Sequence, residues 1–148
     1  MALIKNWDNN TWLSSKDYIK SFSKFLIQNT KLNFKSEILD IGCGRGKISG
    51  NLYSELKLTS KPIGIDIVNH KDKDKRVKFK KSNGLTFLNK NKNFFDLILI
   101  KQTIHLLKMN EITKLINLCK KSLKSKGLIV VLTLDPYKNE IPTFKIMN

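Results

Sequence analysis

The sequence predicts an α/β fold, in which a mostly parallel β-sheet is covered by helices on both faces. Segments of strand length alternate along the chain with amphipathic helical segments, which is the pattern of a parallel sheet. Two strand segments, 95–100 and 128–132, are almost continuously apolar, as expected where both faces of a strand are buried. The 148 residues fit one compact domain. We divide it into an N-terminal helical cap (1–35) and the sheet domain (36–148).

Apolar residues at helical or alternating spacing predict the individual elements. Tyr18, Phe22 and Leu26 recur at helical spacing in the first helix. Gly127 follows the last helix as a C-terminal cap and introduces the fifth strand. In chain order we expect a helix over 14–29, a strand over 37–41, a helix over 47–57, strands over 62–68 and 76–81, a helix over 84–90, a strand over 94–101, a helix over 109–124 and a strand over 127–134.

Two segments are expected to lie outside the regular elements. The stretch 69–75 (NHKDKDK) indicates a solvated, charged loop. After the fifth strand only residues 135–148 follow, and Pro136 and Pro142 interrupt them. We therefore expect any sixth or seventh strand to be missing or extremely short. The outer edge of the fifth strand would then be open to pairing, either in an oligomer contact or with the chain's own tail.

The composition limits the classes of partner. Lys and Arg number 28 against 12 Asp and Glu, which gives a formal net charge of +16. Such an excess can attract nucleic acid, but Arg45 and Arg76 are the only arginines, and Arg supplies most bidentate contacts to bases. A lysine excess with abundant Asn and Ile is also typical of an AT-rich genome, so a nucleic-acid partner is not favoured. No metal-like Cys/His cluster, signal peptide or transmembrane-length apolar run is present, and a cytoplasmic protein is predicted.

A glycine-rich turn after the first strand is the main indication of function. The stretch 39–46 (LDIGCGRG) places an acid at the end of the first strand and alternates three glycines through the following turn. Glycine lets the backbone approach a ligand closely, and the next helix presents unpaired N–H groups at its N-terminus. A dinucleotide site of the GxGxxG type would need a third glycine at Lys47 or Ser49, so that spacing fails.

The turn instead resembles the (D/E)xGxGxG motif of class I S-adenosylmethionine-dependent methyltransferases. Asp40, Gly42, Gly44 and Gly46 match the four motif positions, and the resemblance extends over about residues 36–134. It implies a Rossmann-like sheet and S-adenosylmethionine as the cofactor. It also implies that these four residues, together with Cys43, surround the amino acid end of the cofactor.

Two further positions extend the resemblance. Asp66 lies 20 residues after Gly46 at the end of the second strand, where an acid can accept both ribose hydroxyls. The resemblance implies that Asp66 binds the ribose of the cofactor and that Ile67, beside it, also contacts the cofactor. It places Asn83 and Gly84 near the adenine, although the family usually has Asp where this chain has Asn83. An amide oxygen can accept the same hydrogen bond, but an Asn-Gly pair also forms turns by itself.

The fourth strand and the segment after it complete the predicted site. The resemblance implies that the backbone of Lys101 and Gln102 lines the cofactor pocket. His105 is the candidate general base, since histidine is the side chain best suited to exchange a proton near neutral pH, although a lone histidine here also fits packing or helix capping. Trp7 and Trp12 belong to an N-terminal segment that often covers the site in this family.

Absent motifs narrow the methyl acceptor. The fourth strand continues into Lys101-Gln102-Thr103, without the (D/N)PP(Y/F) motif of amino-group methylation on adenine or glutamine, and without the Pro-Cys pair of cytosine carbon-5 methylation. A small-molecule acceptor is therefore expected. Two alternatives stay open: an RNA methyltransferase guided by the lysine-rich surface, and a truncated, non-catalytic cofactor-binding or partner subunit.

Overall fold

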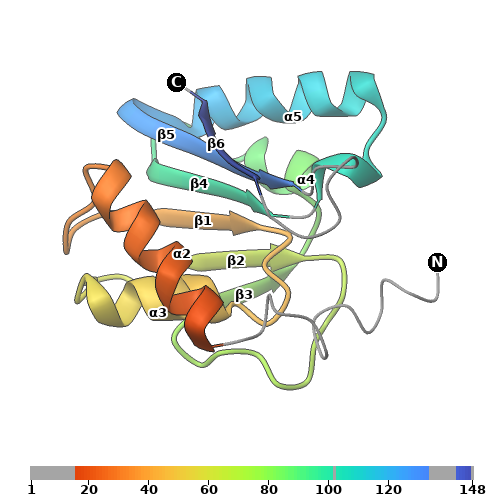
Figure 1. Ribbon diagram of the computed structural model, residues 1–148. Coiled ribbons are helices and arrows are strands. Elements are labelled where there is room, and N and C mark those ends of the chain that lie inside the picture. Colours follow the sequence, from red (N-terminus) through yellow and green to blue (C-terminus); the bar gives the residue numbers. More distant parts are fainter. Residues whose placement is uncertain (1–15, 102, 134–142, 148) are drawn as a thin grey trace.

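The computed structural model describes residues 16–101, 103–133 and 143–147, and it contains a six-stranded sheet between two layers of helices (Figure 1). The strand order is β3-β2-β1-β4-β5-β6. The first five strands run parallel to their neighbours, which confirms the predicted Rossmann-like α/β fold, and β6 runs antiparallel to β5. The strands are β1 (Ile38–Ile41), β2 (Ile63–Asp66), β3 (Lys78–Lys81), β4 (Phe95–Lys101), β5 (Leu123–Thr133) and β6 (Thr143–Met147).

Helices α2 (Lys16–Asn29) and α3 (Lys47–Glu55) cover one face of the sheet (Figure 1). Phe22 and Leu26 of α2 are buried in an apolar cluster with residues of α3, β1, β4 and β5. The helix predicted to form an N-terminal cap therefore contributes to the core on this face. The predicted boundary between residues 35 and 36 falls in the connection between α2 and β1.

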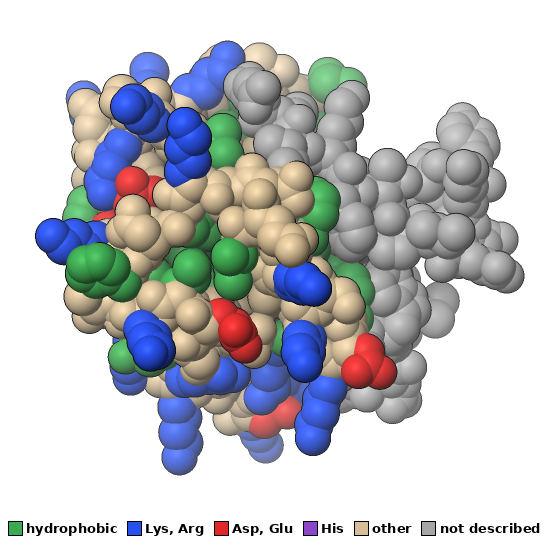
Figure 2. Space-filling view, turned by 60° about the vertical axis from the view of Figure 1, so that its left-hand side comes forward, with side chains coloured by type: hydrophobic (Ala, Val, Ile, Leu, Met, Phe, Trp, Pro, Cys, Tyr) green, Lys and Arg blue, Asp and Glu red, His purple; other side chains and the backbone are tan. Residues whose placement is uncertain are grey.

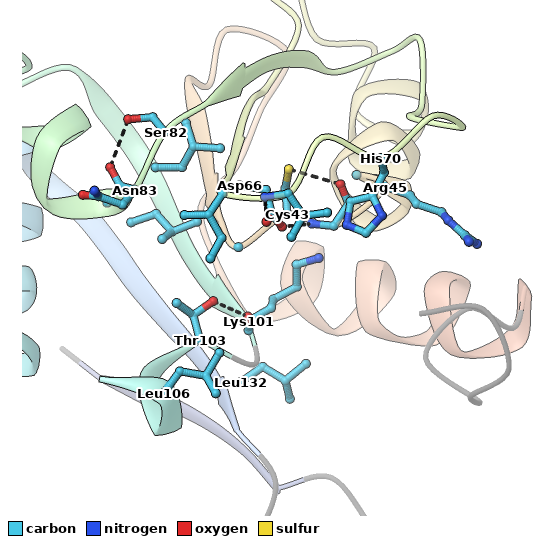
Figure 3. Close-up of a pocket in the computed structure, with 18 of the residues that line it drawn as sticks. Cys43, Arg45, Asp66, His70, Ser82, Asn83, Lys101, Thr103, Leu106 and Leu132 are labelled. Atoms are coloured by element: carbon cyan, nitrogen blue, oxygen red, sulfur yellow. Dashed lines mark hydrogen bonds between the residues drawn. The ribbon is translucent and has the colours of Figure 1, made fainter. Parts of the chain in front are cut away.

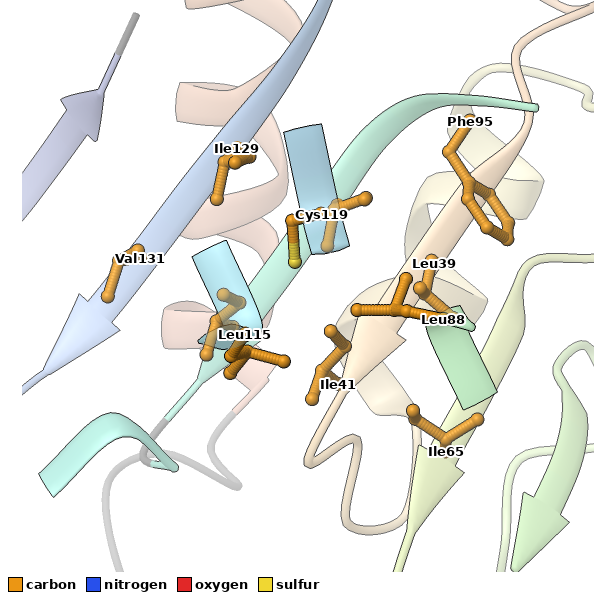
Figure 4. Packing of buried hydrophobic residues seen from close by; sticks show 11 residues of the cluster. Leu39, Ile41, Ile65, Leu88, Phe95, Leu115, Cys119, Ile129 and Val131 are labelled. Carbon is orange, nitrogen blue, oxygen red and sulfur yellow. The ribbon is translucent and has the colours of Figure 1, made fainter. Parts of the chain in front are cut away.

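Helices α4 (Gly84–Leu88) and α5 (Met109–Ser122) cover the opposite face (Figure 4). Leu88 of α4 and Leu115 of α5 are almost fully buried against the sheet. The buried members of this second cluster are Leu39, Ile41, Ile65, Leu88, Phe95, Ile98, Ile100, Leu115, Cys119, Ile129 and Val131. In the part of the chain that the structure describes, no helix is long and apolar enough to cross a lipid bilayer.

Burial on both faces explains the continuous apolar character of the central strands. Along a strand, successive side chains point to opposite faces. In β4, Leu97 and Leu99 join the cluster under α2 and α3, whereas Ile98 and Ile100 join the cluster under α4 and α5. All four side chains are fully buried. The sequence therefore could not alternate between apolar and polar residues here.

The C-terminal part of the fold corrects one prediction. A sixth strand is present, and it pairs antiparallel with β5 from Ile129 opposite Met147 to Thr133 opposite Thr143. The expectation that this strand is missing or extremely short is therefore wrong, since β6 has an ordinary length of five residues, although no seventh strand occurs among the described residues. Because β6 supplies the main-chain partners of the outer edge of β5, the chain's own C-terminal segment covers the edge at which an oligomer contact was considered.

Candidate active site

A cavity of about 580 Å³ opens where the parallel strands β1, β2 and β4 end (Figure 3). Its walls come from the turn after β1, the end of β2 with its following loop, the start of α4, and the connection from β4 into the short 3₁₀ helix η3 (Ile104–Leu106). In open α/β sheets, ligands bind outside the carboxyl ends of the strands at the point where the strand order reverses. Here the order reverses between β1 and β4, so this cavity is the candidate active site.

The glycine turn forms one wall, and its conformation requires glycine. Gly42, Gly44 and Gly46 have φ angles of 69°, 55° and 72°, in the left-handed region that other residues rarely adopt. At Gly42 an added Cβ atom would lie 2.0 Å from Oγ1 of Thr103, so the turn also needs glycine for its close approach to the segment after β4. Gly46 precedes α3 without a side-chain cap. The first N–H groups of α3 are therefore suited to bind an anionic ligand group.

The Asp66 carboxylate is fixed to the main chain at the end of β2. Its Oδ2 accepts a hydrogen bond of 2.8 Å from the N–H of Gly44, and its Oδ1 accepts one of 2.9 Å from the N–H of Val68. A carboxylate has about four lone-pair positions, so two hydroxyl groups of a ligand can still donate to it. Ile67 and Val68, which are 67% and 44% exposed, line the cavity beside Asp66 and offer apolar surface to a ring.

Asn83 lines the cavity but also caps a helix. Its Oδ1 accepts a hydrogen bond of 2.9 Å from the N–H of Thr86 at the start of α4. An adenine amino group would therefore share this oxygen with the helix cap. Gly84 also lines the cavity, and an added Cβ atom there would lie 2.8 Å from Cδ1 of Leu115. Glycine at this position thus permits the close packing of α4 on α5.

Asp40 is near the cavity without lining it. Its side chain is fully buried, its Oδ2 accepts a hydrogen bond from the Ser49 hydroxyl, and the same oxygen lies 3.4 Å from Nζ of Lys101. Burial raises the pKa of Asp40, and the Lys101 ammonium and the Ser49 hydroxyl counteract part of that rise. Lys101 does line the cavity, at 13% side-chain exposure. The resemblance implied only a backbone role for Lys101, and Ser49 was not predicted at all.

The loop between β2 and β3 contacts the glycine turn through Arg45. These contacts were not predicted from the sequence. The N–H of Asp74 donates a hydrogen bond of 2.8 Å to the carbonyl of Arg45, and the Arg45 side chain lies 3.0 Å from Asp72. Asp74 is buried and accepts hydrogen bonds from Nε and Nη2 of Arg76 at 3.0 and 2.8 Å. Burial raises the pKa of Asp74, but the bonds from Arg76 outweigh burial and lower it overall. Gly50 makes room for this carboxylate, because an added Cβ atom would lie 2.5 Å from Oδ2 of Asp74.

The two histidines differ in their position relative to the cavity. His105, the predicted general base, is exposed in η3 and is not among the residues that line the cavity, whereas His70 of the β2–β3 loop lines it. His70 lies in the stretch that the sequence analysis assigned to a solvated loop, and nothing in the sequence distinguishes it there. The predicted site residue Gln102, together with Trp7 and Trp12, lies outside the described residues.

Cys43 lies in the cavity wall as predicted from the motif, but its thiol is buried. Burial raises the pKa of the Cys43 thiol well above its usual range, so at neutral pH it is not a thiolate nucleophile. Cys119 is also a free, buried cysteine. Among the described residues, no group of three or more His, Cys, Asp or Glu side chains could hold a metal ion.

Comparison with protein families gives one match that covers most of the chain. A family model described as "Methyltransferase domain" matches residues 32–147, which include every described residue of the cavity wall except Tyr18 of α2. No curated protein matches the chain.

Solved structures share the fold at low sequence identity. A SAM-dependent methyltransferase from Archaeoglobus fulgidus superimposes with a TM-score of 0.72 at 23% identity, over 91% of this chain and 59% of that one. A SAM-dependent methyltransferase from Leishmania major superimposes with a TM-score of 0.63 at 24% identity, over 77% of this chain and 48% of that one. The 1,6-didemethyltoxoflavin-N1-methyltransferase of Burkholderia thailandensis, solved with 1,6-didemethyltoxoflavin and S-adenosylhomocysteine, gives 0.70 at 14% identity, over 98% and 64%. The chain thus spans about half to two thirds of the length of these structures.

Proposed function

The chain belongs to the methyltransferase domain family, and from this premise we propose that it transfers a methyl group from S-adenosylmethionine to a small-molecule acceptor. The observation that carries the proposal is the hydrogen bond of 2.8 Å between the Gly44 N–H and the Asp66 carboxylate. It joins the two predicted halves of a cofactor site, the glycine turn and the ribose-binding acid, in one cavity.

The residues present fit this cofactor. The glycine turn and the start of α3 suit the amino acid tail, the carboxylate of Asp66 suits the ribose hydroxyls, and the apolar surface of Ile67 suits the adenine ring. When bound, S-adenosylmethionine supplies a methyl group already activated on a sulfonium. The protein then has to orient the acceptor in line with that group and exclude water.

The remaining wall of the cavity favours a small acceptor. Leu106 and Leu132 line it beside Lys101 and Thr103 (Figure 3), and Tyr18 of α2 is also a lining residue. This wall is mostly apolar, as in pockets for small organic ligands. The Burkholderia thailandensis structure, which shares this fold, holds 1,6-didemethyltoxoflavin together with S-adenosylhomocysteine. Both observations support a small, partly apolar acceptor.

The proton acceptor of the reaction belongs to the same proposal. We retain His105 as the general base proposed from sequence, although a movement of η3 would be needed to bring its exposed side chain to the cavity. In-line transfer from a sulfonium does not require a base on the protein when the acceptor is itself nucleophilic. A cytoplasmic location is likewise proposed from the sequence.

Calorimetric titration with S-adenosylmethionine, S-adenosylhomocysteine and NAD tests the cofactor assignment. We expect micromolar binding of the first two compounds and none of NAD. In the Gly44→Ala variant, a Cβ atom on the cavity wall should weaken S-adenosylhomocysteine binding at least tenfold. Alanine is preferred to valine because a β-branched residue is more strained than alanine at a φ of 55°, where every side chain is strained to some degree. Wild-type protein that binds NAD but neither adenosyl compound would overturn the proposal.

A radiolabelled methyl donor then tests the acceptor class. Transfer of label to small heterocyclic or phenolic compounds is expected, and transfer to RNA alone would favour the nucleic-acid alternative. Lys and Arg side chains are distributed over the described part of the face shown in Figure 2, and RNA binding that falls steeply with salt would support that alternative as well. A chain that binds the cofactor but methylates neither class would favour the non-catalytic alternative.

A further inference from the structure

Lys101 brings a positive charge into the cavity at a position that the motifs do not specify. It is the last residue of β4, it lines the cavity, and its side chain is 13% exposed. Figure 3 shows the side chain extending from the end of β4 toward the part of the cavity where Cys43 lies. The ammonium group is therefore placed beside the glycine turn rather than in bulk water.

The partner of this ammonium explains why it stays there. Asp40 is fully buried, and a buried carboxylate needs hydrogen bonds or a counter-charge. Ser49 supplies the hydrogen bond, and Lys101 supplies the counter-charge at 3.4 Å. This ion pair anchors the lysine side chain at the cavity wall.

The charges along the cavity define a direction for the ligand. Asp66 provides negative charge at the end of β2, and in Figure 3 Asn83 and the Lys101 ammonium lie on different sides of it. The uncapped start of α3 follows the glycine turn and adds positive partial charge there, and Arg45 and Lys47 of this segment also line the cavity. An anionic ligand group is therefore favoured at the Lys101 side, and an uncharged ring is favoured at the other.

We propose that the Lys101 ammonium binds the carboxylate of the cofactor's amino acid tail, so that Lys101 selects cofactor forms that carry this carboxylate. The inference rests on the proposed function, since it assumes an adenosyl cofactor with an amino acid tail. It assigns Lys101 a side-chain role in binding, in addition to its ion pair with Asp40.

Three probes separate this role from a structural one. S-adenosylhomocysteine has the complete tail, decarboxylated S-adenosylhomocysteine lacks only the carboxylate, and 5′-methylthioadenosine lacks the whole tail. For Lys101→Met we expect the affinity for S-adenosylhomocysteine to fall about 10- to 100-fold, as expected when a charge-assisted hydrogen bond is lost. The affinities for the two probes without a carboxylate should stay within about twofold of wild type.

Further variants keep the test decisive. Lys101→Arg preserves the charge and should retain most of the preference for S-adenosylhomocysteine. If Lys101→Met fails to fold because Asp40 loses its counter-charge, the double variant Asp40→Asn/Lys101→Met removes both charges together. Lys124→Met is the matched control, because Lys124 pairs with Asp96 at the opposite end of the sheet and its side chain is 43% exposed.

Each outcome decides the proposal. An equal loss of affinity for all three probes would mean that Lys101 acts through Asp40 and the fold, and would overturn it. Unchanged binding of S-adenosylhomocysteine would overturn it as well. If wild-type protein binds none of the three probes, the proposed function fails and this inference fails with it. If wild-type protein binds all three probes but does not prefer S-adenosylhomocysteine over the two that lack the carboxylate, the proposed function stands. Only the proposed role of Lys101 is then overturned.

Discussion

The hydrogen bonds between Asp74 and Arg76 should make a measurable, pH-dependent contribution to stability. Asp74 accepts bonds from the backbone N–H, Nε and Nη2 of Arg76, at 3.0, 3.0 and 2.8 Å. Fully desolvated charge-assisted bonds each contribute about 1.5–3 kcal/mol. The Arg76 side chain is 40% exposed, so water screens the pair. We therefore expect Asp74→Asn to lower the free energy of unfolding by only about 1–2 kcal/mol, equivalent to about 2–8 °C in the melting temperature.

The sign of the pH dependence follows from the lowered pKa of Asp74. A carboxyl whose folded-state pKa is depressed stabilises the fold above its unfolded pKa, about 3.9. That stability is lost as the pH falls through the folded pKa. The difference between wild type and Asp74→Asn should therefore be largest at neutral pH and shrink below about pH 4. Urea denaturation of both proteins across the pH 3–7 range measures it.

A neighbouring acid provides the control. Asp72 lies in the same loop and pairs with Arg45, but its side chain is 63% exposed. Asp72→Asn should therefore leave the unfolding curve almost unchanged. Coincident stability profiles of wild type and Asp74→Asn at every pH would show that the carboxylate contributes no net stability. The assignment of the Asp74 carboxylate as a group that stabilises this loop through Arg76 would then be wrong.

Two further predictions concern the cavity and the packing around it. Asp66→Ala should reduce the affinity for S-adenosylhomocysteine about 10- to 100-fold, because the ligand hydroxyls lose a charged acceptor; calorimetry that finds unchanged affinity would remove Asp66 from the ribose role. Gly84→Ala should lower stability by about 1–3 kcal/mol, because the added methyl group meets Leu115 at 2.8 Å. A denaturation midpoint equal to that of wild type would show that α4 can shift at no cost.

Most of the fold could be predicted from the sequence, because strands and helices are indicated by local patterns of apolar residues. The continuous apolar runs in β4 and β5 predicted strands that are buried on both faces, and both strands are. The start of β5 was placed too late, since it begins at Leu123 before the predicted C-cap Gly127. The strand is irregular there, with a register shift between Phe95 and Leu97 of β4. The sixth strand was missed because β6 directly follows Pro142.

The candidate site was predictable where it follows a motif, and not where it depends on packing between distant segments. The glycine turn and Asp66 could be expected together, because parallel strands end at one edge of the sheet. The ion pair of Lys101 with Asp40 depends on the pairing of β1 with β4, which the order of elements does not reveal. The burial of Asp74 depends on the missing side chain of Gly50. The charged stretch 69–75, in which Asp74 lies, gives no indication in the sequence that one of its acids is buried.

The two main-chain hydrogen bonds to Asp66 have a consequence for the entropy of ligand binding. Because Gly44 and Val68 already hold both carboxylate oxygens, folding has immobilised the side chain before any ligand arrives. A ligand that donates two hydroxyl groups then finds its acceptors fixed, and it does not have to restrict a rotating side chain, which commonly costs about 0.5–1.5 kcal/mol. At this position the protein is preorganised, and discrimination between ligands depends on how well their hydroxyl groups match a rigid pair of oxygens.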